Sequence, residues 1–172
     1  MTGLKTVVRV GGLMLALGAL GACETVPSGN AYGPPASTAF NLEAFNWSTR
    51  SGQASINGTI AYQQDGRAFD CIGSVGLTPD TPYTRARFNT LYGSVNRAAV
   101  PVAVVRARSV PDPNADYRSF VRDVTCADRR FTFTGLPDGG WFIIAPVSDG
   151  GEPVVLMRRV ETRGGRMISV TM

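Results

Sequence analysis

One stretch near the end of the chain constrains the fold more than any other. Residues Arg130–Val147 have the sequence Arg-Phe-Thr-Phe-Thr-Gly-Leu-Pro-Asp-Gly-Gly-Trp-Phe-Ile-Ile-Ala-Pro-Val. Phe131 and Phe133 alternate with threonines, which is the period-two pattern of a half-buried strand. After a turn rich in Pro, Asp and Gly, the second half is apolar on both faces, which is typical of a strand covered on both sides. The stretch therefore predicts a β-hairpin inside a layered structure.

The rest of the chain predicts more short strands. It contains 20 Gly and 11 Pro in 172 residues, which indicates many turns and few long helices. We expect an all-β fold, an antiparallel β-sandwich of about seven to eight strands. Besides the two strands of the hairpin, the segments expected to be strands are Ala54–Tyr62, Phe69–Thr78, Ala98–Arg108, Tyr117–Cys126, Pro153–Val160 and Met167–Met172. Residues 40–47 fit neither a helix nor a strand pattern well.

One segment, residues 81–93, predicts a short helix instead. Thr81 suits the N-cap, Pro82 suits the first helical position, and Gly93 suits the end of the helix. An apolar stripe at helical spacing would lie against the sandwich, formed by Phe88, Leu91 and Tyr92.

Three of these segments resemble the carboxypeptidase regulatory-like domain, a transthyretin-like family. They are Ile56-Asn57-Gly58-Thr59-Ile60, Val75-Gly76-Leu77-Thr78-Pro79 and the run from Phe131 to Trp141. The resemblance covers residues 54–78 and 117–172 and implies a seven-stranded sandwich without a catalytic residue. Trp141 stands one place later than the usual aromatic residue, because the glycine before it is doubled. Residues 79–114 have no counterpart in the minimal pattern of the family.

The start of the chain has the pattern of an export signal. Lys5 and Arg9 precede an apolar run from Val10 to Ala22, which is too short for a comfortable membrane span. The run ends in Leu20-Gly21-Ala22-Cys23, which resembles a bacterial lipobox and implies cleavage after Ala22 and lipidation of Cys23. Glu24 then favours the outer membrane. The alternative is an ordinary secreted protein with a cysteine at this place by chance.

This pattern predicts three regions. Residues 1–22 form a lipoprotein signal peptide, residues 23–39 form the lipidated N-terminus and a flexible tether, and residues 40–172 form the sandwich. The tether is rich in small residues, Pro and Gly, and ~15 such residues reach roughly 20 Å. The expected location is the outer membrane, with the domain in the periplasm or at the cell surface.

Two further cysteines remain after Cys23. An even pair in an exported protein favours a disulfide between Cys71 and Cys126. The alternative is two free or metal-binding thiols, although two thiols without histidine make a poor zinc site.

The absence of certain residue types limits the chemistry. The chain has no His, and its one Lys, Lys5, lies in the leader, so a Ser-His-Asp triad, a Cys-His pair and a mature Ser-Lys dyad are excluded. Fifteen basic and thirteen acidic residues follow the leader, too small an excess to indicate a nucleic-acid partner. We therefore expect that the protein is not an enzyme and that it has no catalytic residue, no cofactor and no metal site.

The remaining candidates for binding are arginines, aromatic residues and turn acids. Three basic groups lie near the ends of predicted strands: Arg129-Arg130, Arg158-Arg159, and Arg163 with Arg166. They could bind lipid headgroups or an anionic polysaccharide, and the alternative is that they are solvated side chains at strand edges. Trp47, Trp141 and the tyrosines would stack on sugars or lie in the core. The acids Asp138, Asp149 and Glu152 lack the ligand spacing of an EF-hand, although any two acids can meet in space as a hydrolase pair.

The sequence thus predicts an envelope lipoprotein whose sandwich is a non-enzymatic structural or interaction module. The alternative is a module that binds polysaccharide or peptidoglycan. The expected partners are membrane lipid through Cys23 and an envelope protein or glycan.

Overall fold

The computed structural model describes residues 37–172 except 109 and 111–114, and it confirms the predicted β-sandwich. A three-stranded sheet has the order β11-β1-β8, and a larger sheet has the order β6-β10-β9-β5-β7 with β4 paired to β9. The smaller sheet contains β1 (Ala54–Thr59), β8 (Arg130–Leu136) and β11 (Met167–Thr171). The larger sheet contains β4 (Asp70–Cys71), β5 (Ser74–Pro79), β6 (Arg97–Pro101), β7 (Arg122–Thr125), β9 (Gly139–Ser148) and β10 (Val154–Thr162). A small hairpin consists of β2 (Gln63–Gln64) and β3 (Arg67–Ala68).

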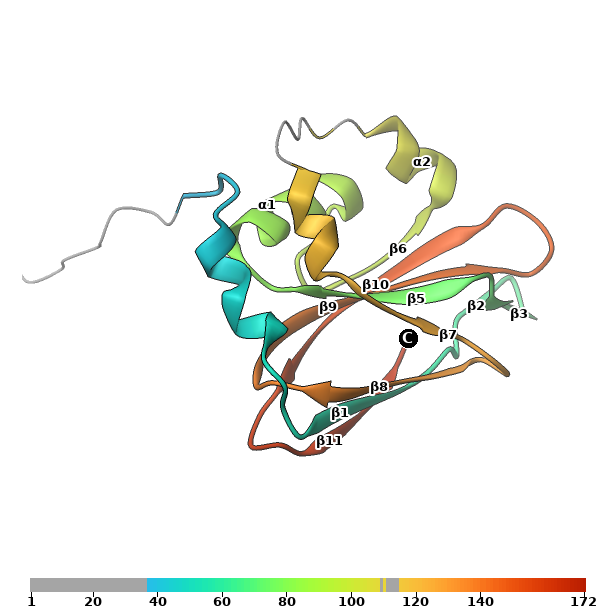
Figure 1. Ribbon diagram of the computed structural model, residues 1–172. Coiled ribbons are helices and arrows are strands. Elements are labelled where there is room, and N and C mark those ends of the chain that lie inside the picture. Colours follow the sequence, from blue (N-terminus) through green and yellow to red (C-terminus); the bar gives the residue numbers. More distant parts are fainter. Residues whose placement is uncertain (1–36, 109, 111–114) are drawn as a thin grey trace, which may run out of the picture. The chain divides into compact units, whose positions relative to one another are not determined.

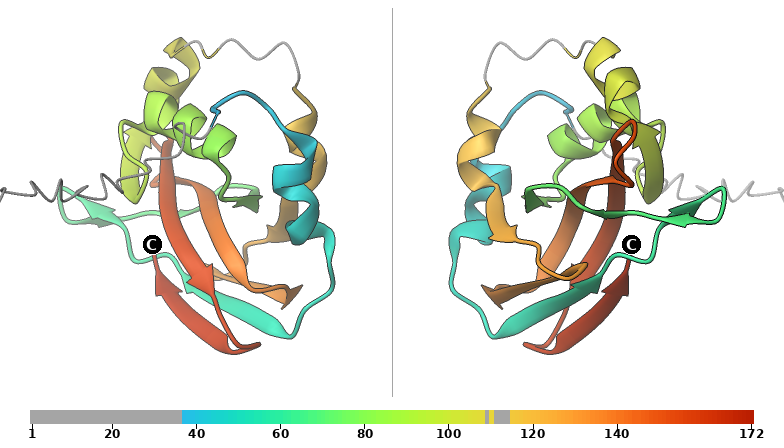
Figure 2. Two further views of the ribbon diagram at one scale, coloured as in Figure 1. Left: turned by 90° about the vertical axis from the view of Figure 1, so that its left-hand side faces the viewer. Right: turned by 90° about the vertical axis from the view of Figure 1, so that its right-hand side faces the viewer.

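The helical segments are the α-helices α1 (Pro82–Tyr92) and α2 (Val102–Ala107) and the 3-10 helices η1 (Leu42–Thr49) and η2 (Ala115–Phe120). The α-helices form a helical layer above the outer face of the larger sheet, while the two 3-10 helices lie next to each other along one side of the domain, where η1 runs down toward the smaller sheet (Figure 1). Figure 2 shows the same arrangement from two sides. The described residues therefore contain more helical segments than the one short helix that we expected.

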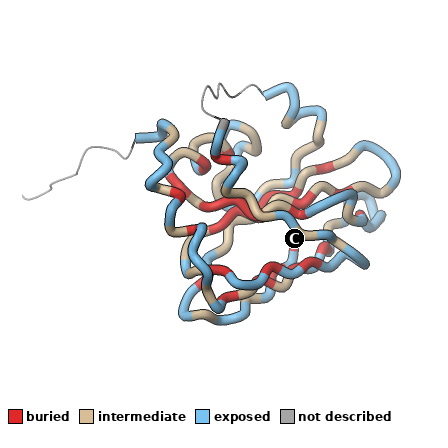
Figure 3. The backbone as a smooth tube through the Cα atoms, viewed as in Figure 1, coloured by how far each residue is buried: buried red, intermediate tan, exposed pale blue. Residues whose placement is uncertain are grey.

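Strand β9 is covered on both faces, as its sequence predicts. Its residues Trp141, Ile143, Ala145 and Val147 are fully buried between the two sheets. Phe142 points the other way and packs edge-on against Phe88 of α1, with ring centroids 4.9 Å apart. The buried residues form a band along the middle of the domain (Figure 3).

Helix α1 begins and ends where the sequence predicts. The Thr81 hydroxyl accepts a hydrogen bond from the Thr84 backbone N–H at 3.2 Å, and the Thr84 hydroxyl accepts one from the Thr81 N–H at 2.9 Å. This reciprocal capping box satisfies two of the free donors at the helix start. Gly93 ends the helix in the left-handed region, at φ 71°.

Strand pairing differs from the prediction in two places. β8 and β9 do not form a hairpin, because β8 pairs with β1 in the smaller sheet while β9 pairs with β5 and β10 in the larger one. The turn at residues 137–138 therefore carries the chain from one sheet to the other. In addition, β1 and β11 run parallel, so the sandwich is not purely antiparallel.

Two segments predicted as strands are partly helical. The strand expected at Ala98–Arg108 ends at Pro101, which has no N–H to continue the ladder, and α2 follows. The strand expected at Tyr117–Cys126 begins only at Arg122. The preceding 3-10 turn, η2, places Tyr117 against Tyr83 and Phe120 against Phe45, so aromatic packing decides its conformation.

The predicted disulfide between Cys71 and Cys126 is confirmed. It joins β4 to the residue after β7, with Cα atoms 6.0 Å apart and a sequence separation of 55. Closing a loop of this length stabilises the fold by about 4 kcal/mol in the chain-entropy model.

The doubled glycine at the crossing between the sheets has a steric cause. A Cβ atom on Gly139 would lie 2.2 Å from a ring carbon of Trp47, and one on Gly140 would lie 2.9 Å from the Asp80 carboxylate. The Trp47 ring in turn meets the edge of Trp141 at a centroid distance of 4.8 Å. Both glycines therefore allow the backbone to approach neighbouring side chains closely.

We expect Gly139→Ala to lower the free energy of unfolding by about 2 kcal/mol, because the Trp47 ring must move to admit the new methyl group. Gly76→Ala is the matched control, since its added Cβ would meet its nearest neighbours at an ordinary 3.5 Å. Urea denaturation of both variants measures the difference. Equal midpoints for the two variants would contradict the steric explanation.

Candidate functional site

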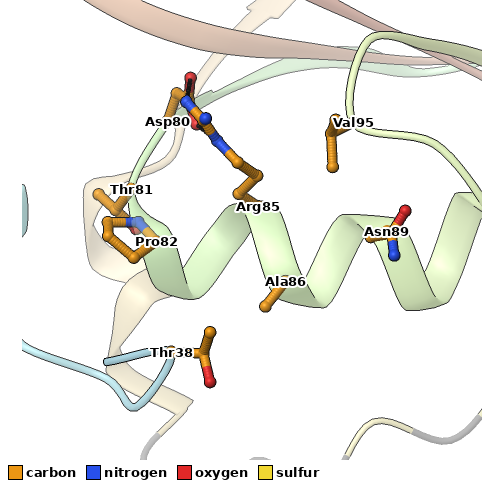
Figure 4. Close-up of a pocket in the computed structure, with 8 residues that line it drawn as sticks. All are labelled: Thr38, Asp80, Thr81, Pro82, Arg85, Ala86, Asn89 and Val95. Carbon is orange, nitrogen blue, oxygen red and sulfur yellow. Dashed lines mark hydrogen bonds and ion pairs between the residues drawn. The ribbon is translucent and has the colours of Figure 1, made fainter. Parts of the chain in front are cut away.

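A groove of about 570 Å³ runs along one side of helix α1. Four of its residues form one stripe of α1 at positions 82, 85, 86 and 89, which share a helix face. This stripe is distinct from the apolar one at Phe88, Leu91 and Tyr92 that packs on the sheet. The groove is lined by Thr38, Asp80, Thr81, Pro82, Arg85, Ala86, Asn89 and Val95 (Figure 4).

The best-defined polar feature of the groove is a buried carboxylate. Asp80 lies between β5 and α1, and its side chain is only 2% exposed. Its two oxygens accept hydrogen bonds from Arg85, from Nε at 3.0 Å and from Nη2 at 2.6 Å. Arg159 of β10 donates a further bond from its Nε. Two guanidinium groups thus surround one carboxylate, which compensates its burial.

The network is tied to the fold by backbone contacts. The Asp80 N–H donates to the Gly140 carbonyl at 2.9 Å, which fixes the start of α1 against the start of β9. Figure 4 shows the Arg85 side chain reaching back from α1 toward Asp80. Because Arg85 is half-exposed, at 51%, the N–H groups that do not face Asp80 remain available to a ligand in the groove.

Arg85 keeps its positive charge near neutral pH. The hydrogen bonds that Arg85 donates to Asp80 raise the pKa of Arg85 above its ordinary value, and burial opposes this shift. On the buried side of α1, burial raises the pKa of Tyr92 to about 12, assisted by Tyr117. Neither shift produces a group that exchanges protons near pH 7.

The arginines grouped in the sequence do not form shared basic clusters in the structure. Arg158 and Arg159 are consecutive in β10 and therefore point to opposite faces of the sheet, and Arg159 is the one that reaches Asp80. Arg129 instead lies 3.4 Å from Asp70, and Arg163 lies 2.8 Å from Glu161. Arg130 and Arg166 are exposed.

The turn acids have structural partners. The Asp138 carboxylate accepts hydrogen bonds from the backbone N–H groups of Gly164, at 2.6 Å, and Gly165, at 3.3 Å. Asp149 forms an ion pair with Arg67 at 3.0 Å. Glu152 is exposed. Within the described part of the chain, no three Cys, Asp or Glu side chains gather as metal ligands.

The tryptophans serve the core. Trp141 is fully buried, and its indole N–H donates to the Thr162 hydroxyl at 3.1 Å. Trp47 is half-buried against it. Trp141 is therefore unavailable for stacking on a sugar.

The structure describes two of the three cysteines. Cys23 lies outside the described residues, while Cys71 and Cys126 form the disulfide. Among the described residues there is no helix both long and apolar enough to cross a membrane.

Sequence reasoning missed Asp80, Arg85 and Asn89 as site residues. The available signal was local: Asp80 directly precedes the predicted N-cap Thr81, and Arg85 follows five positions later on the first turns of the helix. The partner from β10 could not be found in this way, since 79 positions separate Asp80 and Arg159.

We expect Asp80→Ala to lower the free energy of unfolding by about 2 kcal/mol, because a buried acceptor of charged hydrogen bonds is lost. Asp70→Ala is the matched control: Asp70 is 76% exposed in its own ion pair with an arginine, so its removal should cost about 0.5 kcal/mol or less. Chemical denaturation at constant salt measures both. A cost for Asp80→Ala no larger than that for Asp70→Ala would contradict a structural role for the network.

Comparisons with known proteins support the fold. No family model matches the chain, and no curated protein matches its sequence. Among solved structures, the chain is similar to a candidate carbohydrate-binding protein from Pseudomonas aeruginosa, with a TM-score of 0.51 and 19% identity. The similarity covers 77% of this chain and 97% of the other. At this identity the likeness concerns the fold alone.

Proposed function

We propose that this chain is a lipid-anchored envelope protein whose sandwich binds a glycan in the groove beside α1 without catalysing a reaction. The observation that carries the binding role is the fixed Asp80–Arg85–Arg159 network at the edge of an open groove. A site whose polar groups are held in place before binding loses less entropy when a ligand enters.

The groove offers the kinds of polar group that sugars require. A sugar hydroxyl both donates and accepts hydrogen bonds, so its site needs both kinds of partner. Arg85 supplies N–H donors, Asn89 supplies an amide that donates and accepts, and the Thr38 hydroxyl does both. The apolar side chains of Pro82, Ala86 and Val95 complete the lining and suit the carbon face of a sugar ring.

A binding role fits the groove better than hydrolysis does. Glycoside hydrolysis ordinarily requires two carboxyl groups, one on each side of the bond that breaks. Among the described residues that line this groove, Asp80 alone carries a carboxylate, and its oxygens are already occupied by two arginines. The complete absence of His from the sequence supports the same conclusion.

Two further observations support a glycan of the cell envelope as the ligand. The similar structure from Pseudomonas aeruginosa belongs to a candidate carbohydrate-binding protein. The basic and apolar leader that precedes Cys23 predicts export and lipidation, and two or three acyl chains would hold the domain at a membrane beside the envelope polysaccharides.

Asn89→Ala tests the groove with little risk to folding, since Asn89 is an exposed residue on α1. We expect this variant to bind envelope glycan about fivefold more weakly, as removal of one or two hydrogen bonds predicts. The control is Thr90→Ala, an adjacent exposed position that does not line the groove. Co-sedimentation with purified peptidoglycan sacculi and calorimetry with soluble oligosaccharides give the affinities. Unchanged affinity of Asn89→Ala, or no retention of the wild type on any envelope glycan, would overturn the proposal.

The anchor has its own test. We expect Cys23→Ala to abolish incorporation of radiolabelled palmitate and to release the protein from the membrane fraction, because the acylated thiol is gone. The control is the Cys71→Ser, Cys126→Ser double variant, which lacks the disulfide but keeps Cys23 and should still be labelled. Equal labelling of Cys23→Ala and wild type would exclude this anchor while leaving glycan binding to be judged separately.

A further inference from the structure

A second hollow, of about 310 Å³, lies at the edge of the larger sheet and away from the groove beside α1. It is lined by Tyr62, Arg97, Ala98, Ala99, Leu156, Met157, Arg158 and Met172. None of these residues lines the groove beside α1. A volume near 300 Å³ is at the lower end of the range for small-molecule sites.

The hollow exists because the two sheets differ in width. β6 is the edge strand of the larger sheet and pairs with β10. In this pairing Ala99 lies opposite Leu156, which belongs to the core between the sheets, so Ala99 and Arg97 are on the face directed toward the smaller sheet. Both are nevertheless exposed. The smaller sheet therefore leaves the inner face of β6 uncovered.

Two arginines lie side by side in this uncovered strip. Arg97 and Arg158 are direct partners across the antiparallel β6–β10 ladder. Like charges placed opposite each other in this way destabilise a sheet. Within the described part of the chain, no acidic group forms an ion pair with either arginine. This differs from the groove beside α1, where a buried carboxylate compensates the neighbouring guanidinium.

The fold restrains one of these arginines at its side chain and the other at its backbone. Arg158 donates from Nη1 to the Thr171 carbonyl at the end of β11, which leaves the other N–H groups of its guanidinium free for a ligand. Beside Arg97, the Ser94 hydroxyl accepts from the Arg97 backbone N–H at 3.2 Å. These contacts fix the backbone of one arginine and the side chain of the other.

The rest of the lining is mostly apolar. Leu156 is buried at the base of the hollow, and Met172 is 4% exposed. The Tyr62 ring is positioned by an edge contact with Phe69, at 5.1 Å between centroids, and by a hydrogen bond from its hydroxyl to Gln64 at 3.2 Å. A ligand that fills this space must therefore have an anionic group at one end and a compact body that tolerates apolar contact.

We infer that this edge pocket binds a small organic carboxylate, with its carboxylate between Arg97 and Arg158 and its body against Tyr62 and Leu156. Guanidinium groups match the planar geometry of a carboxylate and bind it by charge-assisted hydrogen bonds. The ligand would also relieve the repulsion between the two arginines. This site is independent of the proposed glycan groove, which lies along α1.

Calorimetry with glucuronate tests this assignment, because glucose has the same ring without the carboxylate and inorganic phosphate has charge without the ring. We expect the wild type to bind glucuronate and neither of the others comparably. Arg97→Gln should weaken glucuronate binding about tenfold or more, the loss expected for charged hydrogen bonds. Arg166→Gln, an exposed arginine outside the pocket, and Asn89→Ala, in the other groove, should leave it unchanged.

A stability measurement without ligand adds a readout that does not depend on affinity. Arg97→Gln should raise the urea midpoint of the free protein, since it removes the like-charge pair, and should lose the increase that glucuronate gives the wild type. Equal binding of glucose and glucuronate, phosphate binding as tight as glucuronate, or unchanged affinity of Arg97→Gln would each overturn the inference.

Discussion

The burial of β9 on both faces is the constraint on which the rest of the domain depends. A strand with apolar residues on both faces loses much of its stabilisation if either face is exposed to water, so it needs a layer on each side. The smaller sheet covers Trp141 and Ile143, and α1 covers Phe142. Once α1 is fixed there by Phe88, a neighbouring stripe of the helix is left exposed, and this stripe lines the groove that contains Arg85 and Asn89. The candidate site is thus a consequence of how the core closes.

The sequence predicted burial better than pairing. Period-two alternation tells which residues of a strand are buried, and it did so correctly for Phe131, Phe133 and Trp141. It does not tell which strand lies alongside, so a turn within one sheet and a crossing between two sheets have the same local pattern. The doubled glycine lies at the crossing between the sheets. It is needed there because Trp47 and Asp80, which are far away in the sequence, approach the backbone closely. The capping of α1 was predictable because its signals lie within the helix segment itself. The disulfide was predictable because only two cysteines remain after Cys23.

The two failed strand predictions lie where a missing backbone donor or a tertiary contact overrides intrinsic preference. Valines at alternate positions favour a strand at 100–104, yet the missing N–H of Pro101 ends the ladder and Val102 donates instead to the Pro153 carbonyl, at 2.9 Å. Around Tyr117 the aromatic contacts with Tyr83 favour a 3-10 turn. The Asp80–Arg159 contact belongs to the same class, because no local motif relates its two residues. Sites assembled from distant strands are therefore the part of a β-sandwich that a single sequence reveals least.

The adjacent arginines of β10 explain why the two pockets differ in character. Since successive side chains of a strand point to opposite faces, Arg159 is directed to the helical layer and Arg158 to the space between the sheets. Arg159 meets Asp80, so the groove beside α1 holds a carboxylate between two guanidiniums and keeps a mixture of donors and acceptors suited to neutral hydroxyls. Arg158 is the cross-strand partner of Arg97, and neither forms an ion pair in the described chain, so the edge pocket offers donors and positive charge. One dipeptide thus places one arginine on each face of the larger sheet, and because only Arg159 has a buried carboxylate as its partner, we propose a different class of ligand for each pocket.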